Sequence, residues 1–179
     1  MRLLLLRHAK SDWSGKPGDH ERPLAPRGRK NAPQIGAYMR DKAYNPALVL
    51  CSTALRAKQT LELVLPFFES EPEMRFERAL YLAEWPLLMA EIKDVTATST
   101  PLLLVGHNPG LEQLAIALAL QPHTAAERDR TEKLASKFPT AALAVFDFDV
   151  SEWPEIRPGK GRLVDFVRPK DLRAGGSAA

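Results

Sequence analysis

The sequence predicts an α/β fold in which a mainly parallel central sheet carries helices on both faces. Short apolar runs alternate along the chain with segments whose apolar residues recur at helical spacing. Near-continuous runs such as RLLLLR, ALVLCST and PLLLVG are typical of parallel strands buried on both faces. Each run leads into polar or charged residues, and ligands of such sheets bind beyond the carboxyl ends of the strands.

The first half of the chain predicts two strands, each followed by a helix. RLLLLR (residues 2–7) forms the first strand, and a polar stretch rich in Gly and Pro follows from Ser11 to Gly28. A helix is expected over residues 29–42, where the apolar residues recur at helical spacing. ALVLCST (47–53) is the next strand, and LRAKQTLELVLPFF (55–68) continues at a helical period until Pro66. The residues that carry the first helical pattern are Ala32, Ile35, Tyr38 and Met39.

The second half continues the alternation. PLLLVG (101–106) predicts a strand that ends on a histidine, and GLEQLAIALAL (110–120) predicts the helix after it. Period-2 alternation in AALAVFDFDV (141–150) and RLVDFV (162–167) predicts further strands. We expect one domain over residues 1–172 and a flexible tail, RAGGSAA, over residues 173–179.

Composition limits the classes of function. With 45% apolar and 26% charged residues in 179, the chain has the composition of an ordinary globular domain. The net charge of +3 is mild and the basic residues are scattered, which argues against a nucleic-acid partner. No apolar run approaches the ~18 residues of a membrane span. Because LLLL is also too short for a signal peptide, a cytoplasmic protein without a membrane partner is expected.

Unusual residues follow three of the predicted strands. Arg7 and His8 end the first strand, Arg56 comes shortly after the second, and His107 and Asn108 follow LLLVG. If these strands are parallel neighbours, the groups meet at one edge of the sheet. The sequence therefore predicts one site built from distant segments.

The residue types at this edge favour a phosphoryl site. Arginine matches phosphoryl oxygens with bidentate hydrogen bonds, and a neutral imidazole can attack phosphorus to form a covalent intermediate. Nearby guanidinium charges disfavour the imidazolium form and would keep His8 neutral. The same cations would stabilise negative charge on the transferring group. Taken singly, each residue is more often an ordinary structural or surface group.

The motifs in chain order resemble the histidine phosphatase superfamily and, within it, the phosphohistidine phosphatases of the SixA type. They are LLLLRHAKSDW, DHERPLAPRG, LCSTALRAKQT and LLLVGHNPGLEQLA, which cover the chain from about Arg2 to Leu120. The resemblance implies the phosphoglycerate-mutase-like fold and a phosphorylated nucleophile at His8. It also implies that Arg7 and Arg56 clamp the phosphoryl oxygens and that His107 donates to them. Arg22 would line the entrance and Asn108 would contact the substrate.

Two departures from the family pattern bear on the substrate. Ala9 replaces the glycine of the wider family's RHG, a change that the SixA-type branch tolerates. Family members acting on phosphate esters usually carry a carboxylic acid between the second arginine and the second histidine. Glu84 is the best placed candidate here, with Glu77 and Glu91 as others, although Glu84 could equally be a solvated residue at a helix N-terminus.

Whether a carboxylic acid is needed depends on the group that leaves the phosphorus. An imidazole leaving from phosphohistidine can carry a proton on its other nitrogen, so it needs less acid assistance than an alkoxide. A weak or missing acid therefore favours N–P bonds. The 50 residues between Arg56 and His107 leave no obvious room for a separate cap, so an uncapped pocket is expected.

Two rival phosphatase signatures fit less well. Cys51 is the only cysteine, so no internal disulfide or thiolate cluster forms, and only four residues separate it from Arg56, where cysteine phosphatases have five. Asp147 and Asp149 resemble an aspartyl nucleophile motif, but Val150 follows in place of glycine. Alternation instead predicts both aspartates on an exposed face, with Phe146 and Phe148 on the other. No metal ligand set is found, and no metal or cofactor is expected.

The sequence thus favours a phosphatase that hydrolyses phosphohistidine on a protein through phospho-His8. A small-molecule phosphate monoester phosphatase of the same superfamily and a non-catalytic phospho-ligand-binding module remain alternatives. A mutase is disfavoured, because it needs the acid and a larger enclosure. The partner would be a phosphohistidine-bearing signalling protein or a small phosphorylated metabolite.

Overall fold

A single six-stranded sheet forms the centre of the computed structural model, which describes residues 1–15 and 18–174. Its strand order is β3-β2-β4-β1-β5-β6. The first four strands in this order run parallel, and β5 is antiparallel to both of its neighbours. The sheet is therefore mainly parallel, as predicted. The strands are β1 (Arg2–Arg7), β2 (Leu48–Ser52), β3 (Glu73–Glu77), β4 (Leu102–Gly106), β5 (Leu143–Asp147) and β6 (Arg162–Val167).

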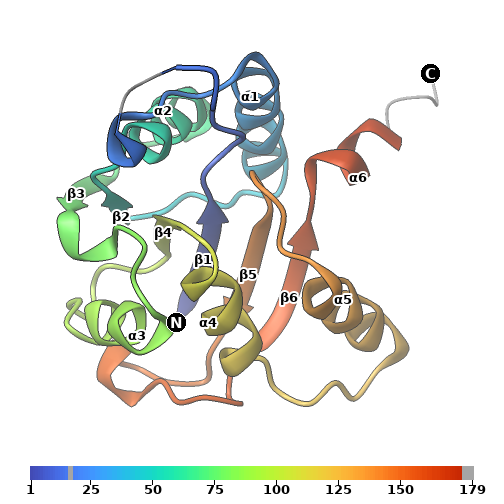
Figure 1. Ribbon diagram of the computed structural model, residues 1–179. Helices are drawn as coiled ribbons and strands as arrows, with labels where there is room; N and C mark the ends of the chain where they lie inside the picture. Colours follow the sequence, from blue (N-terminus) through green and yellow to red (C-terminus); the bar gives the residue numbers. More distant parts are fainter. Residues whose placement is uncertain (16–17, 175–179) are drawn as a thin grey trace.

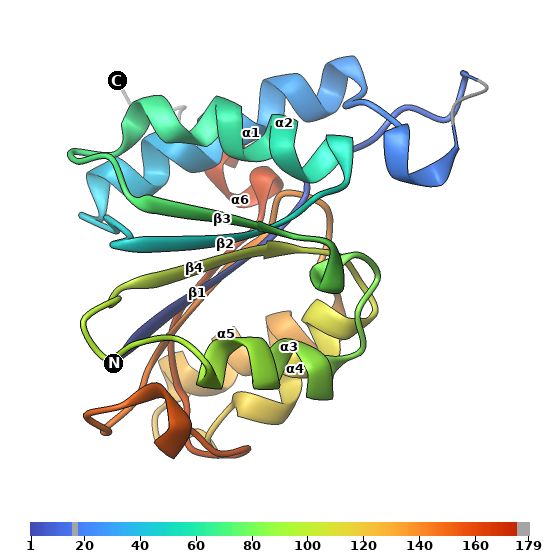
Figure 2. The same cartoon turned by 90° about the vertical axis from the view of Figure 1, so that its left-hand side faces the viewer.

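Helices cover both faces of the sheet and make three layers (Figures 1 and 2). Figure 2 shows α1, α2 and α6 on one face and α3, α4 and α5 on the other. No helix in the described part of the chain has the length and apolar character needed to cross a membrane. The helices are α1 (Pro26–Asp41), α2 (Leu55–Val64), α3 (Trp85–Lys93), α4 (Gly110–Leu118), α5 (Ala125–Ser136) and α6 (Pro169–Ala174), with short 3-10 turns η1 (Asp19–Glu21), η2 (Leu65–Phe67), η3 (Arg78–Leu80) and η4 (Trp153–Glu155).

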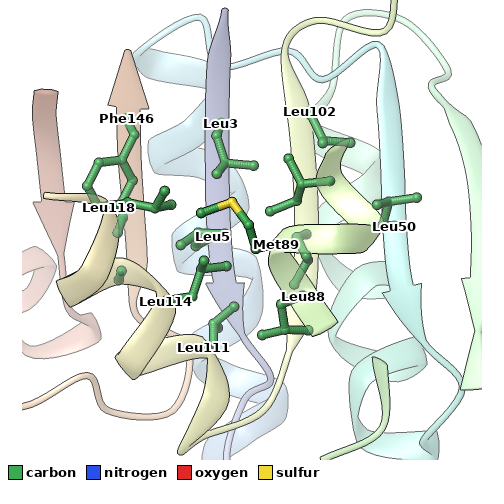
Figure 3. Packing of buried hydrophobic residues seen from close by; sticks show 14 of the residues in the cluster. Leu3, Leu5, Leu50, Leu88, Met89, Leu102, Leu111, Leu114, Leu118 and Phe146 are labelled. Carbon is green, nitrogen blue, oxygen red and sulfur yellow. The ribbon is translucent and has the colours of Figure 1, made fainter. Parts of the chain in front are cut away.

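The leucines of β1 serve both layers of the core. Side chains alternate along a strand, so Leu3 and Leu5 pack in the core beneath α3 and α4, whereas Leu4 and Leu6 pack on the side of α1 and α2. Figure 3 shows Leu3 and Leu5 on the first of these faces. All four are fully buried. Each such leucine contributes about 1.5–3 kcal/mol of burial free energy, so the strand that leads to His8 is firmly held.

No range was predicted for β3, α3, α5 or α6, and the reason is identifiable for β3 and α5. β3 is an edge strand with the polar sequence EMRFE and pairs only with β2, so it lacks an apolar run. Helix α5 buries only Leu134, and charged residues occupy most of its length. Its start is set by a capping box between Thr124 and Glu127.

The ends of two predicted segments also differ. Helix α1 begins at Pro26 rather than residue 29, because proline is well suited to the first helical turn. The segment expected as a tail over residues 173–179 overlaps α6, which continues to Ala174. The remainder of that segment, residues 175–179, lies outside the described residues.

Candidate active site

The histidines that follow β1 and β4 lie side by side at one edge of the sheet. Strand β4 lies between β1 and β2, and the register pairs Arg7 with Gly106. The ring centroids of His8 and His107 are 5.0 Å apart. In Figure 2 the segment between β1 and α1 projects beyond the sheet at this same edge. The convergence that the sequence predicted for strand ends is therefore present.

Backbone contacts fix the ring of His8 and its tautomer. The backbone N–H of His8 donates to the Gly106 carbonyl (3.1 Å), and the ring Nδ1 lies 2.8 Å from the Ala9 carbonyl. A carbonyl oxygen only accepts, so Nδ1 must carry the hydrogen and Nε2 must carry the lone pair. The Ala9 N–H in turn donates to Thr60 Oγ1 (2.9 Å). His8 therefore presents an unprotonated Nε2 from a fixed ring.

Burial keeps both imidazoles neutral. The pKa of His8 is lowered to about 3, first by burial and then by the charges of Arg56, Arg7 and Arg22. The pKa of His107 is lowered to about 2, again mainly by burial. The sequence predicted the effect of the guanidinium groups, and burial proves to be the larger cause. Near neutral pH, His8 is in its nucleophilic form.

Arg7 and Arg56 each offer an unused hydrogen-bond donor. Arg56 is 2% exposed, and its two terminal nitrogens donate to the Asp19 carbonyl (2.6 Å) and to Asp19 Oδ2 (3.1 Å). Arg7 Nη1 donates to the Phe138 carbonyl (2.8 Å). Within the described residues, the buried Nε atoms of both arginines have no partner. A buried donor left unpaired costs about 1–3 kcal/mol, which an anionic ligand would recover.

Ser52 orients His107. The serine Oγ lies 2.7 Å from His107 Nε2 and also accepts from the Ala54 N–H (3.3 Å). When the serine hydroxyl donates to Nε2, the hydrogen of the neutral ring lies on Nδ1, and we assign this tautomer to His107. In the described part of the chain this buried Nδ1 has no partner. His107 is thus arranged as a third free donor.

Arg22 also reaches this cluster. It is 8% exposed, its Nε donates to Asp19 Oδ1 (2.9 Å), and its Nη1 donates to Ser11 Oγ (3.1 Å). The exposed ring of Trp13 lies over its guanidinium carbon, 3.4 Å from the ring centroid. Gly28, in the same RPLAPRG motif, allows α1 to pack closely, because a Cβ there would lie 2.2 Å from the Lys10 carbonyl oxygen.

Sequence reasoning missed Asp19 and Tyr81. The carboxylate of Asp19 joins Arg22 and Arg56, and the hydroxyl of Tyr81 donates to Asp19 Oδ2. The edge of the Tyr81 ring also faces His107, with the centroids 5.5 Å apart. The available signal was the position of Asp19 in DHERPL, three residues before Arg22. Turn η1 contacts Arg56 through the carbonyl and the carboxylate of Asp19.

Asn108 holds the rim of the site together. Its Nδ2 donates to Glu112 Oε2 (3.1 Å) and to the Phe138 carbonyl (3.0 Å), the same carbonyl that accepts from Arg7. The amide donors of Asn108 are therefore used within the protein. Its buried Oδ1 has no partner among the described residues.

Glu84 lies at the start of α3, with an exposed side chain. Its carbonyl accepts from the Leu87 N–H (3.1 Å) as the helix begins. The neighbouring Ala83 carbonyl packs on Gly110, where a Cβ would lie 1.9 Å from that oxygen. This packing brings the Glu84 backbone near the helix that follows His107. Within the described residues, no hydrogen bond or ion pair holds its carboxylate in the site.

Cys51 and Asp147, the alternative nucleophiles that the sequence suggested, are not part of the His8 site. Cys51 is fully buried and its pKa is raised to about 12 by burial, so it is a thiol rather than a thiolate. Asp147 is ion-paired to Arg2 and Arg162, while Phe146 and Phe148 are buried, as the alternation predicted. Over residues 1–15 and 18–174, no group of three or more His, Cys, Asp or Glu side chains is arranged to hold a metal ion.

A neutral histidine among converging arginines defines a class of site suited to phosphoryl groups. The model of the histidine phosphatase superfamily (branch 1) matches residues 3–85. An uncharacterized protein of Mycobacterium tuberculosis (strain H37Rv) is 38% identical over 165 residues, which are 92% of this chain and 100% of the relative. The chain therefore belongs to the histidine phosphatase superfamily.

Solved structures agree with this assignment. A candidate phosphohistidine phosphatase SixA from Nakamurella multipartitia has a TM-score of 0.80 and 27% identity, covering 94% of this chain and 95% of its own. A candidate SixA from Agrobacterium tumefaciens has a TM-score of 0.75 and 30% identity, covering 94% and 97%. The recognised family and the histidine-phosphatase fold are thereby confirmed, and phosphatase activity is supported.

Proposed function

We propose that this protein is a phosphohistidine phosphatase that acts through a phosphorylated His8. The observation that carries the proposal is the unprotonated Nε2 of His8, next to buried arginine and histidine donors that lack partners in the described chain. An anionic phosphoryl group would supply those donors with acceptors and present its phosphorus to Nε2.

In the first step, Nε2 of His8 attacks phosphorus and the N–P bond of the substrate breaks. The leaving imidazole departs neutral when its other nitrogen carries a proton. Arg7, Arg56 and His107 would donate to the oxygens of the transferring group and stabilise its charge. The arginines reach the group through the Nε–H donors that have no protein partner among the described residues.

In the second step, water attacks the phosphorus of phospho-His8. The bond to Nε2 breaks, the water protons stay on the phosphate product, and His8 regains its lone pair. The hydrogen stays on Nδ1, which donates to the Ala9 carbonyl throughout. The ring thus starts and ends the cycle in the same tautomer.

The state of Glu84 supports an N–P bond over a phosphate ester. Its exposed carboxylate makes no bond that would aim it at a leaving group, within the described residues. An alkoxide needs a positioned acid, whereas an imidazole needs less help. A protein-borne phosphohistidine is therefore the proposed substrate.

Rates on a phosphohistidine peptide, p-nitrophenyl phosphate and a panel of alkyl phosphates test this proposal. We expect the highest kcat/KM on the peptide and an acid-labile phosphoenzyme in rapid-quench samples. His8→Ala should abolish turnover and the phosphoenzyme, whereas Cys51→Ala, the matched nucleophile control, should retain both.

Each contrary outcome overturns a different part of the proposal. Faster hydrolysis of alkyl phosphates would contradict the substrate class and leave the histidine mechanism standing. Turnover by His8→Ala would contradict the mechanism. Binding of the phosphopeptide without phosphate release would indicate a binding module.

A further inference from the structure

We propose that Asp19 is a positioning residue of this site, whose carboxylate joins the guanidinium groups of Arg22 and Arg56 and holds both at the phosphoryl pocket. The inference rests on the proposed function, because it assigns these arginines to a phosphoryl ligand. Nothing in the sequence motifs assigned a role to Asp19.

The two carboxylate oxygens of Asp19 serve different arginines. Oδ1 accepts from Arg22 (Nε 2.9 Å and Nη2 2.7 Å), whereas Oδ2 accepts from Arg56 Nη2 (3.1 Å). The backbone carbonyl of Asp19 accepts from Arg56 Nη1 (2.6 Å). One residue therefore fixes the orientation of both planar cations.

This arrangement leaves the useful donor of Arg56 free. Asp19 occupies the Nη end of the guanidinium, while Nε stays buried without a partner in the described chain. Arginine has five N–H donors, so a ligand can bind the Nε side while Asp19 keeps the other. Asp19 thus orients Arg56 without having to leave when phosphate enters.

Asp19 is itself held from two directions. The Tyr81 hydroxyl donates to Oδ2, and the neighbouring His20 contacts Thr53 Oγ1 through Nε2 (2.9 Å). These bonds connect the segment after β1 to the ends of β2 and η3. The pKa of Asp19 is lowered to about 2, with the Tyr81 bond as the largest cause, so the carboxylate is charged at working pH.

Charge and geometry predict a distinctive kinetic signature. Asp19→Asn removes a negative charge next to the arginines, which by itself favours binding of an anion. It also replaces one acceptor oxygen by an N–H donor facing a guanidinium, which loosens the alignment. Misalignment by about 1 Å can cost on the order of 10²-fold in rate. We therefore expect kcat to fall about 10- to 100-fold while KM stays within about threefold.

The experiment compares Asp19→Asn, Asp19→Glu and the matched control Asp12→Asn. Asp12 lies in the same segment, and its carboxylate accepts from the backbone N–H and the hydroxyl of Ser14 rather than from an arginine. Kinetics use whichever phosphate compound the wild type hydrolyses fastest, and the Kd of orthovanadate is measured in parallel by calorimetry. Asp19→Glu should recover part of the lost kcat, and Asp12→Asn should match the wild type.

Three outcomes would overturn the inference. An unchanged kcat in Asp19→Asn would remove any positioning role. Unchanged kcat with tighter vanadate binding would make Asp19 a competitor of phosphate. Equal losses in kcat/KM, vanadate affinity and melting temperature, with no recovery in Asp19→Glu, would make its role structural.

A wild type that hydrolyses no phosphate compound would contradict the proposed function, and the vanadate Kd would still test the role of Asp19. If Asp19→Asn does not fold, Tyr81→Phe removes one bond to Oδ2 and should lower kcat by a smaller factor. No change in that variant would then contradict the inference.

Discussion

In the described part of the chain, two clusters place one aspartate between two arginines, and they differ in burial and in unused donors. At the amino end of β1, Asp147 pairs with Arg2 (2.7 Å) and Arg162 (3.4 Å), and the arginine side chains are 38% and 59% exposed. At the carboxyl end, Asp19 pairs with Arg22 and Arg56, whose side chains are 9% and 2% exposed.

The two clusters differ in which N–H donors of their arginines have no hydrogen-bond partner. Arg2 donates to Asp147 through both Nε and Nη2, and its side chain is partly exposed. Arg56 keeps a buried Nε without a partner in the described chain, beside two neutral histidines. The first cluster is complete by itself, whereas the second is completed only by a ligand. Unused buried donors, rather than arginine pairs as such, distinguish a candidate site from a surface ion pair.

The largest expected effect comes from removing a buried cation. Arg56→Ala should lower kcat/KM by the equivalent of about 2–5 kcal/mol, as when one partner of a buried charge pair is removed. Arg2→Ala, at the exposed cluster, should leave kcat/KM unchanged. Steady-state kinetics of the two variants make the comparison, and a loss below about tenfold in Arg56→Ala would place Arg56 outside the site.

An intermediate effect is expected on stability in acid. The pKa of His8 falls from 6.5 unfolded to about 3 folded, so the unfolded chain binds the additional proton between these values. The free energy of unfolding should therefore decrease as pH falls from about 6.5 toward 3.

Urea unfolding at pH 7.0 and 4.5 measures this dependence. His8→Asn should lose less stability over the interval than the wild type does. The Asp19 carboxylate affects stability only between its folded pKa of about 2 and its unfolded pKa of 3.8, which is below pH 4.5. Asp19→Asn should therefore keep the wild-type slope, and an unchanged slope in His8→Asn would contradict the assignment of His8 as buried and neutral.

The smallest effect is expected at the exposed cluster. Asp147→Asn removes ion pairs that solvent already screens, so the free energy of unfolding should change by no more than about 1 kcal/mol. Catalytic rates should stay at the wild-type value. A large loss of either kind would mean that the two clusters do not differ in the way proposed here.

The sequence was sufficient where a local pattern dictates structure. The leucines of β1, the run LVLCS and the run LLLVG identified the strands, because buried parallel strands need near-continuous apolar residues. The same pattern placed His8 and His107 after strand ends. It was insufficient for β3 and α5, whose polar sequences owe their structure to a neighbouring strand and to a capping box.

The sequence alone identified the residues with catalytic chemistry that follow the strands, namely Arg7, His8, Arg56 and His107. Tertiary structure alone decided how they meet. The strand order places β4 between β1 and β2, burial lowers the pKa of both histidines, and the turn after β1 brings Asp19 onto Arg56. These features depend on packing between residues that are distant in the sequence and on the removal of water from them. A short stretch of sequence therefore does not predict them.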